Sequence, residues 1–147
     1  MKTMWNERDR RALAQRVAAL RPEAAAQWGR MDAPQMVAHV TDCFRMAFGE
    51  FVCTPKHFPI RYPPLKQLVI YLFPFPKSAP TAAELVGRVP ESWTGEVAAL
   101  SALIDRFGRE PRDRAWPDHP AFGTMNARSW GVLMYRHTDH HLRQFGV

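Results

Sequence analysis

Three histidines near the end of the chain have a spacing that can bind a metal ion. His137, His140 and His141 lie in a segment whose apolar residues recur with helical periodicity. His137 and His141 are four residues apart, which on a helix places their Cβ atoms about 5–6 Å apart, one turn above each other. Two imidazoles at this spacing can chelate one cation, whereas unligated imidazoles on a buried face would each need hydrogen-bond partners. His140 lies one position further round the helix, at the rim.

The apolar stripe of the same segment places two of these histidines on its inward face. Trp130, Leu133 and Met134 recur at helical spacing, and steps of three and four residues from them reach His137 and His141. We therefore expect both imidazoles to face the core.

A third imidazole comes from much earlier in the chain. His39 lies midway along another predicted helix, beside the apolar positions Met36 and Val40. In helical bundles, metal sites form from inward side chains on facing helices. By spacing alone, Cys43, one turn after His39, is a rival ligand, and a small buried thiol is its ordinary interpretation. Three neutral imidazoles suit zinc, nickel or ferrous iron and leave positions open for water or substrate.

Four long segments with helical periodicity must position these histidines. They cover residues 6–20, 32–49, 91–107 and 126–144, and a short apolar helix is expected over 65–73. The clearest helix start is at Asp32, where Pro34 needs no amide partner and Gln35 can complete a capping box. Proline-rich connections cover 54–64 and 74–80, and no segment has a convincing strand pattern. The predicted fold is all-α, an antiparallel four-helix bundle with long crossover loops.

Length and composition fit one globular domain spanning residues 1–147. The chain is 46% hydrophobic and 23% charged, the balance of an ordinary soluble protein. The net charge is +6, but the densest charged stretches, 7–11 and 106–114, mix both signs, and no nucleic-acid-binding motif accompanies them. We therefore expect no nucleic-acid partner.

No segment predicts membrane insertion or a disulfide framework. The longest apolar stretch, 65–75, is interrupted by polar residues and proline and is shorter than the roughly 20 residues of a membrane span. The first eleven residues are mostly polar and do not resemble a secretory signal, so a cytoplasmic location is expected. Cys43 and Cys53 are interpreted as reduced thiols.

The segments around the histidines resemble the DinB-like superfamily of bacterial four-helix bundles, the DinB/YfiT-type metalloenzymes. The resemblance is carried by Trp28-Gly29-Arg30-Met31, by Gln35-Met36-Val37-Ala38-His39, and by His137-Thr138-Asp139-His140-His141-Leu142-Arg143-Gln144. The stretch His119-Pro120-Ala121-Phe122-Gly123 and the closing Gln144-Phe145-Gly146 resemble one of its uncharacterised subfamilies. The family's metal triad, one histidine from the second helix and two from the last, maps onto His39, His137 and His141. This mapping leaves His140 as a neighbour of the pocket.

The resemblance also implies a class of chemistry. Characterised relatives include transferases that use low-molecular-weight thiols and a thiol-dependent isomerase, in which the metal would bind the sulfur and lower the pKa of the thiol. We therefore expect a divalent-metal-binding protein that acts as a metal-dependent thiol S-transferase on a small-molecule substrate. The alternatives are a metal-dependent hydrolase and a metal-stabilised binding protein without catalysis. A homodimer is compatible with each.

Three residues are candidates for acid–base roles beside the metal. His140, His119 and Asp118 have side chains that can carry a proton. Each also has a structural interpretation: His140 at the exposed rim of its helix, and Asp118 and His119 in the turn before Pro120. For Asp118 and His119 we favour the structural one.

Overall fold

The structure is a computed structural model that describes residues 1–77, 81–85 and 88–147. These residues contain no strand, only an isolated bridge between His119 and Gly123. The α-helices are α1 (Glu7–Ala19), α2 (Ala33–Ala47), α3 (Leu65–Tyr71), α4 (Trp93–Phe107) and α5 (Ala127–Gln144), and the 3-10 turns are η1 (Pro59–Arg61) and η2 (Ala83–Leu85). The prediction of an all-α fold is confirmed. Of the predicted connection over 74–80, residues 78–80 lie outside the described part.

The long helices begin where the sequence provides capping side chains. At α2, the Asp32 carboxylate accepts from the Gln35 amide at 2.8 Å, and the Gln35 side chain accepts from the Asp32 amide at 3.0 Å. Asn6, Ser92 and Asn126 cap α1, α4 and α5 through their side-chain oxygens. These oxygens satisfy amides that have no partner within the helix, which fixes where each helix starts.

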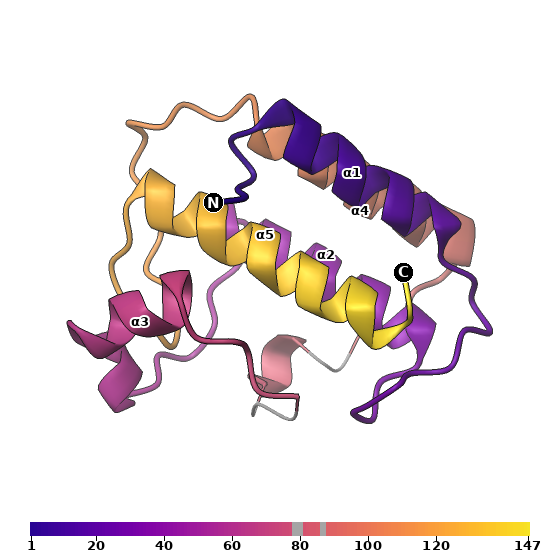
Figure 1. The fold of residues 1–147 in the computed structure, drawn as a ribbon, viewed down its shortest axis with the longest axis horizontal. Helices are drawn as coiled ribbons and strands as arrows, with labels where there is room; N and C mark the ends of the chain where they lie inside the picture. The colour runs from indigo at the N-terminus through magenta and orange to yellow at the C-terminus, as the bar shows by residue number, and fades with distance from the viewer. Residues whose placement is uncertain (78–80, 86–87) are drawn as a thin grey trace.

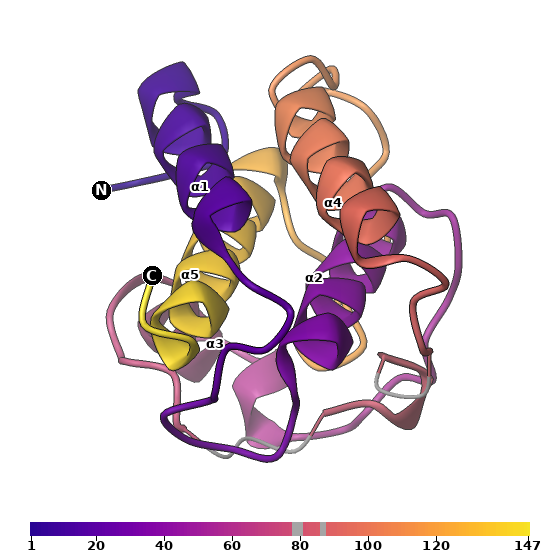
Figure 2. The same cartoon turned by 90° about the vertical axis from the view of Figure 1, so that its right-hand side faces the viewer.

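The four long helices pack around a common core (Figures 1 and 2). α1 contacts α4 and α5, and α2 contacts the same two helices. The largest side chains with almost no exposure are Trp130, Phe44, Phe107, Met4, Leu13 and Met36. The predicted stripe of α5 is part of this core, because Trp130, Leu133 and Met134 are buried.

The helix directions are mixed rather than antiparallel throughout. The colours of Figure 1 show α1 and α5 running one way and α2 and α4 the other. Contacts agree: Arg16 near the end of α1 bonds Asp139 near the end of α5, and Phe107 at the end of α4 packs on Phe48 just after α2. Hence α1–α4 and α2–α5 are antiparallel, whereas α1–α5 and α2–α4 are parallel. The long connection that includes α3 carries the chain back along α2, which permits a parallel pair.

This connection also covers the side of the α2–α5 pair that is turned away from α1 and α4. α3 packs against α5, and η2 packs against α2 (Figure 1). The position of η2 matters for the histidines, because it brings backbone carbonyls next to α2.

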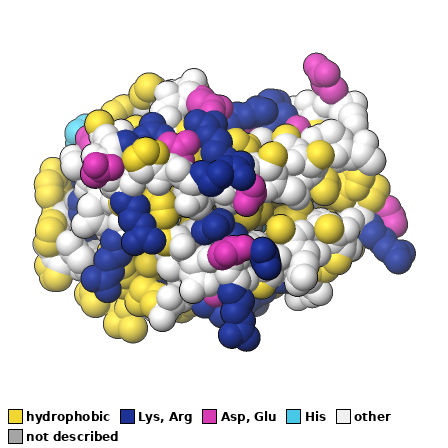
Figure 3. Space-filling view, turned by 90° about the horizontal axis from the view of Figure 1, so that it is seen from above, with side chains coloured by type: hydrophobic (Ala, Val, Ile, Leu, Met, Phe, Trp, Pro, Cys, Tyr) yellow, Lys and Arg dark blue, Asp and Glu magenta, His cyan; other side chains and the backbone are white. Residues whose placement is uncertain are grey.

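Charged side chains of both signs are interspersed on the face shown in Figure 3. Several form ion pairs one helical turn apart, such as Arg11 with Glu7. Within the described residues, no helix has the length and apolarity that a membrane span requires.

The capping box at α2 predicts a measurable contribution to stability. Replacing Asp32 by Ala should lower the free energy of unfolding by about 1 kcal/mol, because the first-turn amides lose their acceptor. The matched control is Asp105→Ala, which removes an exposed carboxylate near the end of α4 that pairs with Arg109, two residues beyond that helix, and should cost at most about 0.5 kcal/mol. Urea denaturation followed by circular dichroism measures both. Equal losses in the two variants would contradict the capping role.

Candidate metal centre

The antiparallel packing of α2 against α5 brings three imidazole rings together. His39 comes from the middle of α2, and His137 and His141 come from the last two turns of α5. The Nε2 atom of His137 lies 3.3 Å from that of His39 and 3.1 Å from that of His141. The ring centroids are 4.7–5.1 Å apart in all three pairs. The three predicted residues therefore lie together, and each points its Nε2 atom toward the centre of the cluster.

The hydrogen bonds on the outer side of the cluster fix two of the three tautomers. His39 Nδ1 lies 2.9 Å from the Leu85 carbonyl, which can only accept, so Nδ1 carries the hydrogen. Gln144 Nε2 donates to the Trp28 carbonyl at 2.6 Å, which leaves Gln144 Oε1 to accept from His141 Nδ1 at 2.9 Å. In neutral His39 and His141, Nε2 therefore carries no hydrogen and has a lone pair that can accept a hydrogen bond or bind a metal ion.

This donor set fits a cation. Two lone pairs face His137 Nε2, which carries at most one hydrogen, so hydrogen bonding can satisfy only one of the two contacts. Tetrahedral zinc holds nitrogen ligands at about 2.0–2.1 Å, which places neighbouring nitrogens about 3.4 Å apart. The observed separations of 3.1 and 3.3 Å are close to that value. One divalent cation would satisfy all three lone pairs.

Burial keeps these imidazoles in the neutral form that binds metals. Desolvation lowers the pKa of His137 well below its ordinary value, and the neighbouring His141 and His39 add to the effect. Burial, with a smaller contribution from His39, lowers the pKa of His141 to about 3. Burial also lowers the pKa of His39, although the bond to Leu85 opposes the shift. Metal ligation requires the deprotonated ring, so protons compete weakly for this site at neutral pH.

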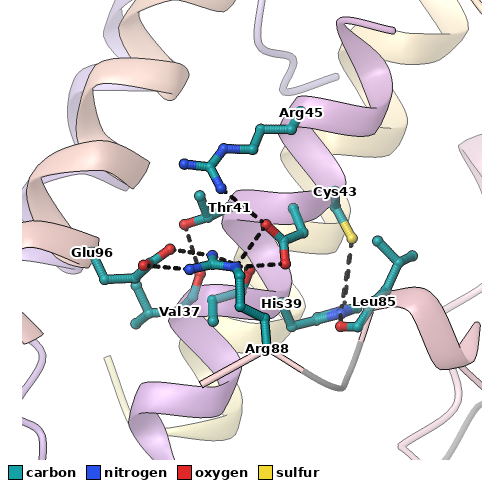
Figure 4. Close-up of polar contacts among 10 residues, drawn as sticks. Val37, His39, Thr41, Cys43, Arg45, Leu85, Arg88 and Glu96 are labelled. Carbon is teal, nitrogen blue, oxygen red and sulfur yellow. Dashed lines mark hydrogen bonds and ion pairs between the residues drawn. The ribbon is translucent and has the colours of Figure 1, made fainter. Parts of the chain in front are cut away.

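Cys43 adds a sulfur atom beside the imidazoles. Its Sγ lies 3.8 Å from His39 Nε2 (Figure 4). The donor atoms of His39, Cys43 and His137 all lie within 4.8 Å of one another. Burial is the main cause that raises the pKa of the Cys43 thiol, so without a cation the sulfur stays protonated. The two donor sets, with Cys43 or with His141, share His39 and His137.

The other predicted candidates occupy different positions. His140 is half-buried at the rim, with its ring 5.7 Å from that of Trp28 and 6.0 Å from that of Phe75. Asp118 is exposed, and its Oδ2 atom forms an ion pair with Nη2 of Arg61 at 3.7 Å.

His119 acts inside its own turn. Its Nδ1 accepts from the amides of Ala121 and Phe122 at 3.1 and 3.2 Å. Its ring packs on those of Phe122 and Trp130, at 4.9 and 5.4 Å. These contacts agree with the interpretation of His119 as a residue that shapes the turn.

Sequence reasoning missed the groups that orient the imidazoles. Gln144 lies three residues after His141, a helical spacing that could have identified it. The carbonyls of Leu85 and Trp28 have no signal in the sequence, because any residue supplies a carbonyl.

A hollow on the surface of α1 contains no cluster of side chains that suits catalysis or metal binding. It measures about 390 Å³ along α1, contains no residue of the histidine cluster, and is lined by Glu7, Arg8, Arg11, Ala12 and Gln15. We assign it no function.

Comparison with known proteins identifies one family. Residues 6–145 match the family model described as the DinB superfamily. The matched range includes the four long helices and His39, His137 and His141. No curated protein and no solved structure gives a significant match to the chain.

The contacts of His119 predict a structural effect without loss of metal. His119→Phe should lower the free energy of unfolding at pH 7 by about 1–3 kcal/mol, because two backbone amides lose their acceptor. Metal content, measured by elemental analysis, should not change. Loss of metal with retained stability would instead make His119 part of the centre.

The same variant should alter the pH dependence of stability. Burial lowers the pKa of His119 to about 3, whereas an unfolded imidazole titrates at about 6.5. Between these values the unfolded chain takes up a proton that the folded chain does not, so wild-type stability falls as the pH falls through this range. Because His119→Phe lacks this contribution, the stability difference from wild type should shrink between pH 7 and pH 5 in urea titrations.

Proposed function

The chain belongs to the DinB superfamily, and from that premise we propose that it binds a divalent cation, zinc, nickel or ferrous iron, through His39, His137 and His141. One observation carries the proposal. The bonds to Leu85 and Gln144 leave two Nε2 lone pairs facing the third imidazole, an arrangement that one cation satisfies and hydrogen bonds alone do not. We interpret the four long helices as the family's bundle, which holds these ligands on two facing helices.

We further propose that the site serves a thiol S-transferase with a small-molecule substrate. A bound divalent cation would supply Lewis-acid chemistry that favours the thiolate form of a low-molecular-weight thiol. The three imidazoles are neutral ligands and leave the charge of the cation uncompensated. His137 and His141 are half-buried whereas His39 is buried, so α5 forms the accessible side. His140 lies on that side, where it can exchange a proton with a bound molecule.

A second candidate function is a metal-stabilised binding protein without catalysis. The observation in its favour is the position of Cys43. Zinc bonds of about 2.3 Å to sulfur and 2.0–2.1 Å to nitrogen place the two donors about 3.6 Å apart in a tetrahedron. The Sγ of Cys43 lies 3.8 Å from His39 Nε2. Because Sγ also lies 4.0 Å from His39 Nδ1, the Cys43 side chain has to rotate toward the Nε2 side before its thiolate can take the position that a substrate thiol needs.

The metal ligands can be tested by substitution. His39→Ala, His137→Ala and His141→Ala should each lower the divalent-metal content of the purified protein, measured by elemental analysis. Chelation should lower the melting temperature of wild type more than that of these variants, because a ligand of the folded state alone stabilises it by mass action. His140→Ala is the matched control on the same turn and should retain the metal. If His140→Ala empties the site and His137→Ala does not, the ligands are misassigned.

The cobalt-substituted protein tests the chemistry. Sulfur ligation of cobalt adds a charge-transfer absorption that nitrogen and water ligands lack. A small thiol should produce this band in wild type and in Cys43→Ala, and not in His137→Ala.

The other outcomes separate the alternatives. A band that is present before thiol is added and lost in Cys43→Ala identifies a protein thiolate in the open position, the expectation for the binding protein. No change at millimolar thiol, with cobalt bound, would oppose the transferase and favour a hydrolase.

A further inference from the structure

Arg88 lies in the connection between η2 and α4, and its side chain reaches both α2 and α4 (Figure 4). Its Nε donates to both carboxylate oxygens of Asp42 on α2, at 3.1 and 2.9 Å. Its Nη1 and Nη2 donate to the two oxygens of Glu96 on α4, at 2.8 and 2.5 Å. The guanidinium therefore bridges two helices from a third segment.

This bridge is built in a buried environment. Asp42 and Glu96 are both buried, at 6% and 8% exposure. Hydrogen bonds from Arg88 are the largest cause that lowers the pKa of Glu96. Buried carboxylates that lose their partner are costly, and the planar fork of arginine accepts few orientations. Arg88 is therefore fixed in place relative to α2.

The same segment holds the hydrogen-bond partner of a metal-ligand candidate. Leu85 precedes Arg88 by three residues, and its carbonyl accepts from His39 Nδ1 at 2.9 Å. Arg88 Nη2 also donates to the carbonyl of Ala38, the residue before His39, at 3.3 Å. Leu85 and Arg88 thus contact α2 at His39 and at the residue before it.

We propose that Arg88 is a positioning residue for His39. By fixing its segment to Asp42, Glu96 and the backbone of α2, it keeps the Leu85 carbonyl on His39 Nδ1. That bond puts the hydrogen on Nδ1, sets the ring orientation and leaves Nε2 free to bind the cation. The link to metal affinity rests on the proposed function; the link to the tautomer of His39 does not.

The test compares two arginines of similar exposure. Arg88→Met removes the bridge, and the matched control is Arg106→Met. Arg106 also bridges two carboxylates, Glu50 at 2.5 Å and Glu110 at 2.9 Å, and is 39% exposed against 34% for Arg88. Loss of an outer hydrogen-bond partner typically weakens metal binding by about 10–100-fold. We expect the zinc dissociation constant to rise in this range for Arg88→Met and to be unchanged for Arg106→Met.

A second measurement separates positioning from general destabilisation. The ¹⁵N shifts of the His39 ring in the metal-free protein should report hydrogen on Nδ1 in wild type and in Arg106→Met, and a loss of that tautomer in Arg88→Met. Arg88→Lys keeps the positive charge but cannot donate to both carboxylates as the guanidinium does. This variant should therefore fold, and it should lose the Nδ1 hydrogen of His39 as Arg88→Met does.

Two results would overturn the proposal. One is wild-type His39 nitrogen shifts in both Arg88 variants. The other is an equal loss of zinc affinity in Arg106→Met. If wild type binds no zinc, the proposed function fails, but the nitrogen shifts of metal-free His39 still decide the role of Arg88.

Discussion

The three Nε2 atoms that face one another in the histidine cluster have too few hydrogens to form hydrogen bonds between every pair in contact. The Leu85 carbonyl and the Gln144 side chain each take an Nδ1 hydrogen, from His39 and His141 respectively. These two bonds lie on the outer side of the cluster, yet they leave its inner side rich in lone pairs. The packing of α2 on α5 then brings the nitrogens to 3.1 and 3.3 Å, distances that suit ligands of one cation. The arrangement of lone pairs in the cluster therefore depends on hydrogen-bond partners that lie outside it.

Those outer groups connect the centre to the irregular parts of the chain. Gln144 bonds the carbonyl of Trp28, and its own carbonyl accepts from the amide of Gln27, so the segment between α1 and α2 is held against the end of α5. Leu85 comes from the connection between α3 and α4. The long connection between α2 and α4, which gives the fold its mixed helix directions, thus also orients His39, and the segment between α1 and α2 supports Gln144 beside His141. A bundle with short loops would have the same ligands without these supports.

Local spacing in the sequence predicts the helices and the pair His137 and His141, whereas the inclusion of His39 rests on the family resemblance, because no local pattern links residues so far apart in the chain. Capping residues such as Asp32 and apolar stripes such as that of α5 act within one helix, so they can be recognised without a structure. Helix direction depends on where a connection of many residues returns the chain, and Arg88 is an isolated arginine with no periodic pattern around it. The choice between Cys43 and His141 cannot be made from spacing either, because each lies one turn from another donor.

Charge links the two candidate functions. A divalent cation on three neutral imidazoles would keep its full positive charge in a partly desolvated site, an unfavourable state unless an anion joins it. Asp42 lies only three residues from His39, but its carboxylate bonds Arg88 and Arg45. Thiolate sulfur would supply the missing negative charge, either from Cys43 or from a bound small thiol. The two functions are therefore two ways of meeting the same electrostatic requirement, and the sulfur that meets it decides whether the fourth position is closed or available for chemistry.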